Sequence, residues 1–289
     1  MSLPLVAGEL TTISPSVWRV LAPNAGMMTG PGTNTYLLAA PNGLAVLDPG
    51  PAQPQHIQAI IGASQQLQRP VTHIIVTHTH RDHSPGAQGL LEVFPQAQLL
   101  GKPAPDDGLQ DEAWQPHVTL EDGEQIELEN GCLLTTISTP GHVDNHLCFL
   151  LESEGILFTG DHLIDGSTVV IAPPSGSMSA YLHSLQKLQH HTIATIAPGH
   201  GNLIYQPQEY IQRTIDHRLK REQKVLAALS ADIGQSLEAL VVKAYEDTPP
   251  MLHPLAQYSL WAHLIKLKED ELALEDNNKY WWLCAKRIS

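Results

Sequence analysis

The chain has few cysteines, few fixed cations and no long apolar run. Its three cysteines, Cys132, Cys148 and Cys284, are odd in number and widely spaced, so they form neither a disulfide framework nor a cysteine-based zinc motif. No apolar run approaches the roughly eighteen residues of a membrane-spanning helix. The first residues lack the basic and apolar segments of a secretory signal. We therefore expect a cytoplasmic chain without a membrane segment.

Positive charge is scarce and unevenly placed. There are 16 Lys and Arg against 30 Asp and Glu, which gives a net charge of −14, and residues 1–204 hold only five of the cations but eighteen of the carboxylates. Because phosphate contacts come mostly from Lys and Arg, this front part is a poor match for a polyanion. Only residues 205–289 could offer a local basic surface, and we do not expect DNA as a partner.

The chain is rich in histidine, with 16 in all, and the densest group is THTHRDH at residues 77–83. An apolar run that we predict to be a buried strand leads into it. Side chains two residues apart in an extended chain point the same way, so His78 and His80 can bind one metal ion together. Asp82 and His83 lie where the chain turns and can face a second ion. Imidazole nitrogen and carboxylate oxygen are the ligands that catalytic zinc prefers.

Three further residues of the same chemical types, His142, Asp161 and His200, each follow a glycine just past a predicted strand. Strand-end loops are where α/β architectures place catalytic groups, and glycine allows tight turns and close backbone approach. Together with the four in residues 77–83 they make seven candidate ligands. We predict that they converge on two metal ions roughly 3.5 to 4 Å apart.

The apolar pattern predicts strands alternating with helices up to residue 204, and mainly helices after it. Strands followed by helices occur twice, which predicts two similar layered halves with the helices outside. The tail shows three helices and a hairpin around residues 276–278, the layout of a winged-helix unit. We predict domains at 1–204 and 205–289. The expected strands are 17–23, 33–41, 44–48, 73–77, 125–128, 132–138, 146–152, 156–159 and 192–197, and the expected helices are 53–68, 86–94, 178–190, 207–229, 236–245 and 253–271.

The ligand pattern, His-x-His-x-Asp-His followed at long intervals by His, Asp and His, resembles the metallo-β-lactamase superfamily. Residues 30–36 (GPGTNTY), residues 140–146 (PGHVDNH), the loop at 166–168, the helix at 181–185 and the tail look like its lactamase-β-like-2 group. The resemblance implies an α/β fold, a four-layer αββα sandwich with a dinuclear zinc cleft along the edge of its two sheets. It also implies a small C-terminal winged-helix-like domain.

The resemblance further implies how the ligands divide between the two ions. Two Zn²⁺ among five neutral imidazoles and two carboxylates keep a surplus positive charge, so a bridging water would lose a proton readily. The hydroxide would attack a carbonyl or phosphoryl centre, and the zincs would stabilise the oxyanion. Iron or manganese are the alternative metals, and Asp82 and Asp161 are the predicted catalytic residues. One ion would take His78, His80 and His142, the other Asp82, His83 and His200, and Asp161 would bridge them.

Three residues are candidates for substrate contact. The loop at residues 29–35 is either a plain turn or the rim of the active cleft, and in the second case Thr33 and Asn34 lie near the substrate. The position of His146 resembles that of a histidine in glyoxalase II, which implies contact with the ligands or the substrate. A surface position is the alternative.

The sequence thus predicts a dinuclear zinc-dependent hydrolase acting on an ester-type or phosphodiester substrate. Endoribonuclease activity on single-stranded RNA is the named chemistry of the resembling group, so the substrate is either RNA or a small ester or thioester. The alternatives are a glyoxalase II-like thioesterase and a mono-iron persulfide dioxygenase-like oxidoreductase, and a homodimer is left open. If RNA is the substrate, the predicted phosphate contacts are Arg218, Lys220, Arg221 and Lys224.

Overall fold

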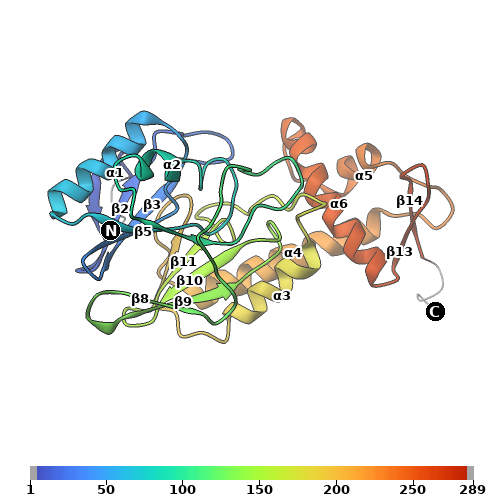
Figure 1. Cartoon of the computed structure of the whole chain (residues 1–289). Helices are drawn as coiled ribbons and strands as arrows, with labels where there is room; N and C mark the ends of the chain where they lie inside the picture. The colour runs from blue at the N-terminus through green and yellow to red at the C-terminus, as the bar shows by residue number, and fades with distance from the viewer. Residues whose placement is uncertain (1–4, 285–289) are drawn as a thin grey trace. The chain divides into compact units, whose positions relative to one another are not determined.

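The computed structural model describes residues 5–284 (Figure 1). The described residues exclude 1–4 and 285–289. The expectation of no secretory signal rests partly on residues 1–4, so it lies partly outside the described residues. Contacts within the chain divide it into two units. The first contains the chain up to Thr139 together with Asn145–Val169 and His191–Gln208, and the second contains Pro140–Asp144, Val170–His190 and the chain from Glu209 onward. The predicted domain boundary at residue 204 stays a prediction.

A seven-stranded sheet forms the first half of the first unit, with its strands in the order of the sequence. The first four strands pair antiparallel and the last four parallel. Parallel neighbours need long crossover connections, and two of these contain the helices α1 (Pro54–Leu67) and α2 (Gly86–Leu91). The strands are β1 (Leu10–Thr12), β2 (Val17–Leu21), β3 (Asn34–Ala40), β4 (Gly43–Leu47), β5 (Val71–Ile75), β6 (Gln98–Gly101) and β7 (Val118–Thr119).

A five-stranded sheet forms the other half, in the order β12-β11-β10-β9-β8. Only β11 and β12 pair parallel. The hairpin predicted from residues 146–159 is confirmed, since β10 and β11 pair antiparallel with Phe149 opposite Phe158. The strands are β8 (Gln125–Glu127), β9 (Leu133–Ser138), β10 (Leu147–Leu151), β11 (Ile156–Gly160) and β12 (Thr195–Pro198), and a short 3-10 turn (Glu129–Gly131) joins β8 to β9.

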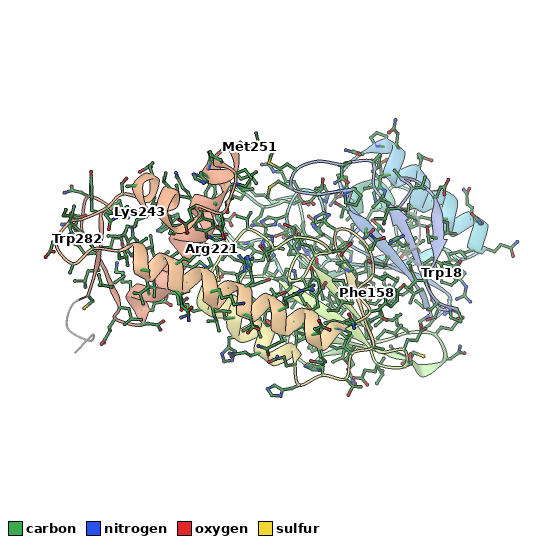
Figure 2. All side chains as sticks on the ribbon, turned by 180° about the vertical axis from the view of Figure 1, so that it is seen from behind. Trp18, Phe158, Arg221, Lys243, Met251 and Trp282 are labelled. Atoms are coloured by element: carbon green, nitrogen blue, oxygen red, sulfur yellow. The ribbon has the colours of Figure 1, made fainter. Side chains whose placement is uncertain are left out.

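Two apolar cores hold this unit in layers of helix, sheet and sheet. On β4, Leu47 points to the core shared by the two sheets, where Phe158 lies fully buried (Figure 2). Its neighbour Val46 points the other way, to the core that the seven-stranded sheet forms with Ile60 of α1 and Leu90 of α2. Successive side chains of a strand alternate between faces, so a strand buried on both faces reads as the unbroken apolar run seen in the sequence.

The second unit is mainly helical. The predicted three helices and hairpin of the tail are present, and Val225, Leu240, Leu264 and Trp281 meet in its core. Ser236 caps α5 by accepting a hydrogen bond from the Ala239 amide, as a helix N-cap serine should. The elements are α3 (Met178–Leu188), α4 (Pro207–Ala228), α5 (Leu237–Ala244), the 3-10 turn η2 (Pro250–Leu252), α6 (His253–Glu269), β13 (Ala273–Glu275) and β14 (Trp281–Leu283).

The strand predicted at 73–77 is β5, and it ends two residues earlier than expected. The Val76 amide still reaches across to the Leu100 carbonyl (3.0 Å), but the Thr77 amide donates instead to Oδ1 of Asp48 (2.7 Å). A side chain therefore takes over from the sheet at this point, which releases the following residues to form a loop. Among residues 5–284, no helix has both the length and the hydropathy needed to cross a bilayer.

Candidate metal centre

Seven ligand-type side chains lie in two groups, and they are the seven that the sequence singles out. Within each group, one potential ligand atom per residue lies within 4.8 Å of all the others. Nε2 of His78 and Nδ1 of His80 lie 2.9 Å apart. The first group is His78, His80, His142 and Asp161, and the second is Asp82, His83 and His200.

Asp161 belongs to the first group and also contacts the second. Its Oδ1 atom lies 3.4 Å from Nε2 of His83 and 3.2 Å from Nε2 of His200. The Oδ2 atom of Asp82 lies at the same two distances from the same two nitrogens. The two imidazoles therefore each face a pair of carboxylates, one from each group.

Neighbouring strand ends position these groups. Asp161 follows β11 and His200 follows β12, and because the two strands are parallel their carboxyl ends share one edge of the sheet. Gly160 has a positive φ of 44°, and a Cβ there would collide with the Thr77 hydroxyl. A Cβ on Gly199 would lie 2.9 Å from Oδ1 of Asp161. Both glycines are therefore needed for this close approach of backbones.

Four of the five imidazoles are oriented through Nδ1, which leaves Nε2 for the group. The Nε2 atom of His83 is buried and makes no hydrogen bond. A buried ring nitrogen without a hydrogen bond, facing carboxylates, fits a metal ligand, so this donor set suits a divalent ion. The Nδ1 contacts are His83 to Asp48 Oδ2 (2.9 Å), His200 to the Gly32 carbonyl (3.1 Å), His142 to the Val170 carbonyl (2.7 Å) and His78 to the Thr77 hydroxyl (3.0 Å).

Asp48 contacts the candidate metal centre, and the sequence pattern does not single it out. Its side chain is 1% exposed and accepts hydrogen bonds from the Thr77 amide (2.7 Å) and hydroxyl (2.8 Å), besides its 2.9 Å contact with His83. It therefore fixes both the start of the motif loop and one of its imidazoles. The available signal is the one that identified Asp161: a carboxylate directly after a buried strand.

Charge pairing dominates the titration of the second group. Burial alone would lower the pKa of His83, but Asp82, Asp161 and Asp48 raise it well above its usual 6.5. In the same way burial would lower the pKa of His200, but the nearby Asp161 and Asp82 carboxylates outweigh burial and raise this pKa to about 10. By contrast, burial lowers the pKa of His78 well below 6.5, and the neighbouring imidazoles lower it further. His78 is therefore a neutral imidazole, the form that binds metal.

The three candidate substrate contacts are fully buried beside the ligands. The Thr33 hydroxyl donates to Oδ2 of Asp82 (3.2 Å). The Asn34 amide donates to the carbonyls of Pro198 and Gly201, each at 2.9 Å, on either side of His200. The His146 ring stacks on that of His78, with centroids 5.0 Å apart, and its Nδ1 lies 2.9 Å from the Thr139 hydroxyl. All three contact the ligands or their loops, and contact with substrate stays a prediction.

Replacing Asn34 with Ala should loosen the His200 loop. The Gly201 carbonyl would lose its donor, while the Pro198 carbonyl would keep the Tyr36 hydroxyl (2.9 Å). Leaving a buried carbonyl unpaired costs about 1 to 3 kcal/mol, and we expect the free energy of unfolding in urea denaturation to fall by about that amount. Metal affinity should fall about 10- to 100-fold. Asn277, an exposed amide, supplies the control: its change to Ala should alter neither quantity. Equal behaviour of the two variants would contradict a positioning role for Asn34.

Comparison with known proteins connects this geometry to a family. Residues 28–200 match the family model described as metallo-beta-lactamase superfamily, and residues 236–282 match that of the beta-lactamase associated winged helix domain. Among curated relatives, the Beta-lactamase-like protein 2 homolog of Drosophila melanogaster is 32% identical over 273 residues, which is 90% of each chain. The Atrochrysone carboxyl ACP thioesterase of Aspergillus fumigatus is 32% identical over 224 residues, 76% of this chain and 67% of that one.

Solved structures show the same fold at low sequence identity. A beta-lactamase domain protein from Burkholderia ambifaria aligns with a TM-score of 0.82 at 17% identity, covering 98% of this chain and 95% of that one. A metallo-beta-lactamase family protein from Thermus thermophilus aligns with a TM-score of 0.77 at 21% identity, covering 94% of this chain and 100% of that one. The predicted α/β sandwich with a winged-helix tail is thereby confirmed. The chain belongs to the metallo-beta-lactamase superfamily, as a metal-dependent hydrolase with a beta-lactamase associated winged helix domain.

Proposed function

We propose that this chain hydrolyses small-molecule esters or thioesters with two divalent metal ions, zinc by preference, held at the seven clustered residues. The observation that carries the proposal is the position of Asp161, which belongs to one ligand group and lies within 3.4 Å of both histidines of the other. A carboxylate so placed can serve two ions at once. His78, His80 and His142 would hold one ion, Asp82, His83 and His200 the other, and Asp161 both.

Two bound ions would supply Lewis-acid polarisation of the ester carbonyl and an acidified water for the attack. The protein's own part is to hold the donors in place. The Thr33 hydroxyl fixes the direction of the Asp82 carboxylate, and Asp48 fixes the ring of His83. These buried contacts keep the ligand atoms positioned before substrate arrives, which is how such sites avoid reorganisation during the reaction.

The distribution and pairing of charge along the chain favour a small substrate over RNA. The first unit contains few cations, and those of α4 are largely engaged by the second unit itself. Arg221 (Figure 2) pairs with Asp247 at 2.8 Å, Lys224 pairs with the same carboxylate at 3.0 Å, and Arg218 is 3% exposed. Three of the four predicted phosphate contacts are therefore occupied or buried. The names of the thioesterase relatives point in the same direction.

The test is elemental analysis of the purified protein, followed by a substrate panel of thioester, ester, lactone, phosphodiester, single-stranded RNA and β-lactam. We expect two zinc ions per chain and turnover of a thioester or an ester. One iron per chain would favour the persulfide dioxygenase-like alternative. Cleavage of RNA that falls steeply with salt would replace the small-molecule proposal, because phosphate contacts release counterions.

Removal of metal should destabilise the fold. An ion that binds only the folded chain adds about 2.7 kcal/mol to the free energy of unfolding when its concentration is 100 times its Kd. We expect chelated protein to unfold at lower urea concentration, and added Zn²⁺ to restore the midpoint. Mg²⁺ prefers oxygen ligands and should restore little, so it serves as the control. A midpoint indifferent to Zn²⁺ would contradict metal binding at the seven residues.

A further inference from the structure

The first unit contains four fixed cations, and three of them have other roles. Arg19 is 1% exposed, Arg69 pairs with Glu129 at 2.9 Å, and Lys102 donates to the Ser138 hydroxyl at 3.3 Å. Arg81 is exposed, and among the described residues it has no ion-pair partner. An unpaired cation within the ligand motif of so acidic a unit is available to bind a ligand.

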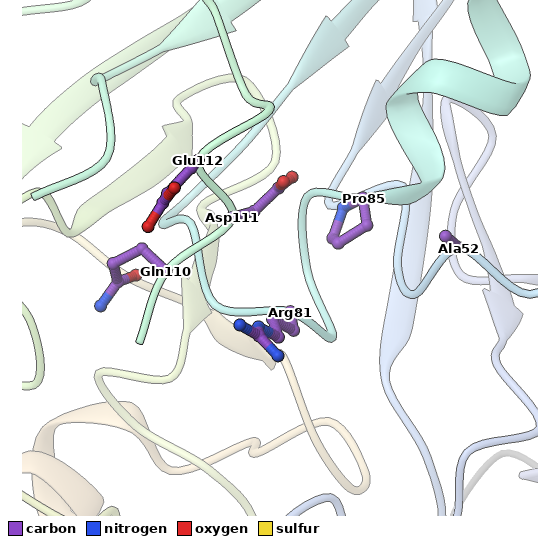
Figure 3. A pocket seen from close by; sticks show the side chains of 6 residues that line it. All are labelled: Ala52, Arg81, Pro85, Gln110, Asp111 and Glu112. Carbon is purple, nitrogen blue, oxygen red and sulfur yellow. The ribbon is translucent and has the colours of Figure 1, made fainter. Parts of the chain in front are cut away.

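Arg81 lines a pocket of about 480 Å³, which lies entirely in the first unit (Figure 3). The rest of the lining is Ala52, Pro85, Gln110, Asp111 and Glu112. Figure 3 shows the side chains of residues 110–112 on a separate stretch of chain from Arg81. The pocket is therefore formed by three segments: the motif loop with Arg81 and Pro85, the segment 110–112, and Ala52.

The wall formed by residues 110–112 is fixed to the motif loop by hydrogen bonds. The Asp111 amide donates to the Thr79 carbonyl (2.7 Å), and the Thr79 hydroxyl donates to Oε1 of Gln110 (3.0 Å). The Ser84 hydroxyl donates to Oδ2 of Asp111 (2.7 Å). Gln110 is 2% exposed, so these bonds are largely shielded from water. The pocket is therefore a built feature beside the ligands rather than a gap between mobile loops.

We propose that Arg81 binds a carboxylate group of the substrate in this pocket, so that the enzyme prefers acyl groups that carry one negative charge. This rests on the proposed hydrolysis of small esters or thioesters. The guanidinium matches a carboxylate geometrically through paired hydrogen bonds. Arg81 lies between His80 and Asp82 in the motif, and Gln110 of the pocket forms a backbone bridge with His80, so the pocket adjoins the loop that carries candidate ligands of both groups.

The opposite wall explains why a carboxylate is favoured over a phosphate. Asp111 and Glu112 line the same pocket, and neither lies within ion-pair distance of Arg81. Both oxygens of Asp111 accept hydrogen bonds, from Ser84 and from the Ala113 amide, which keeps this carboxylate in place. Two fixed negative charges repel a dianion more strongly than a monoanion, so they select against phosphate.

The test compares two thioesters of N-acetylcysteamine, one with a succinyl group and one with the neutral, equally sized succinamoyl group. We expect the full-length enzyme to show a higher kcat/KM for the succinyl thioester. Arg81→Met should lower that kcat/KM about 10- to 100-fold, as expected for a hydrogen bond to a charged group, and should leave the succinamoyl reaction within about twofold. Arg81→Lys should retain part of the preference. Lys102→Met, which changes a cation outside the pocket, should retain all of it.

A binding measurement separates this proposal from the proposed function. Monomethyl succinate is titrated calorimetrically into the full-length protein as purified and into the Arg81→Met variant. The wild-type protein should bind it more tightly than the variant does. The wild-type protein should also bind it more tightly than it binds inorganic phosphate. This arm remains informative even if no thioester in the panel is hydrolysed. Equal rates for the two thioesters, equal affinity of the two proteins for monomethyl succinate, or tighter binding of phosphate would each overturn the carboxylate assignment.

Discussion

Replacing Asp161 with Ala is expected to remove hydrolysis almost completely and to lower the bound metal. The carboxylate belongs to one ligand group and lies 3.4 and 3.2 Å from His83 and His200 of the other, so its loss should affect both proposed ion sites. Metal stabilisation of the transition state is worth several kcal/mol. At about 1.36 kcal/mol per factor of ten, a loss of kcat of about 10³-fold or more follows.

Elemental analysis and turnover of the best substrate in the panel measure the two effects separately. Glu92→Ala is a matched control, because Glu92 is an exposed carboxylate of the same unit that is not among the seven candidate ligands. It should change neither the bound metal nor the turnover. Asp161→Asn adds a second comparison, since it keeps the shape of the side chain and removes its charge. Full metal occupancy with unchanged kcat in Asp161→Ala would refute the assignment of Asp161 to both ions.

The candidate ligands could be identified from sequence because each is a distinctive residue type at a recognisable place. His142, Asp161 and His200 each follow a glycine at the end of an apolar run, and the structure brings them together with residues 77–83. The layered architecture could also be predicted from sequence, because strands such as β4 are apolar throughout and must be buried on both faces. These features depend on local pattern, which a sequence displays directly.

Contacts between distant segments could not be predicted in this way. The sequence leaves open whether the loop containing Thr33 and Asn34 is a plain turn or the rim of the cleft, because its hydrogen bonds to Pro198 and Gly201 join residues more than 160 positions apart. In the same way Arg81 lies in an obvious motif, yet the wall facing it comes from a loop with no regular secondary structure. Such a loop has no periodicity from which its position could be inferred.

Charge counts along the chain also conceal pairing. The tail contains eleven of the 16 fixed cations, which makes it look available for a polyanion. In the structure Arg221 lies over the ring of Tyr245, 4.1 Å from its centroid, and pairs with Asp247, 26 positions further along the chain. A cation held in this way by its own unit is less available to phosphate than its position on a charged helix indicates.

Replacing Asp48 with Ala is expected to affect stability and metal binding together, although Asp48 is not itself among the seven ligands. Its buried carboxylate accepts two hydrogen bonds from Thr77 and contacts Nδ1 of His83. Removing this acceptor leaves the buried Thr77 amide and Nδ1 of His83 without a partner, at about 1 to 3 kcal/mol each. We therefore expect the free energy of unfolding of the metal-saturated protein to fall by about 2 to 5 kcal/mol. Loss of a carboxylate that orients a ligand histidine lowers metal affinity or activity about 10- to 100-fold.

Urea denaturation and competition with a chelator measure the two losses, and two further variants distinguish their causes. Asp48→Asn preserves volume but places an amide opposite three donors, so it should restore packing without restoring the orientation of His83. Glu129→Ala removes a partly exposed carboxylate that accepts from Arg69 in the same unit, and its effect on metal affinity should be small. If Asp48→Ala retained wild-type metal affinity while losing stability, Asp48 would hold only the end of β5. We expect Asp48→Ala to lose both stability and metal affinity. We expect Asp48→Asn to regain part of the stability but none of the metal affinity. This is the result expected of a carboxylate that links the fold to the metal centre.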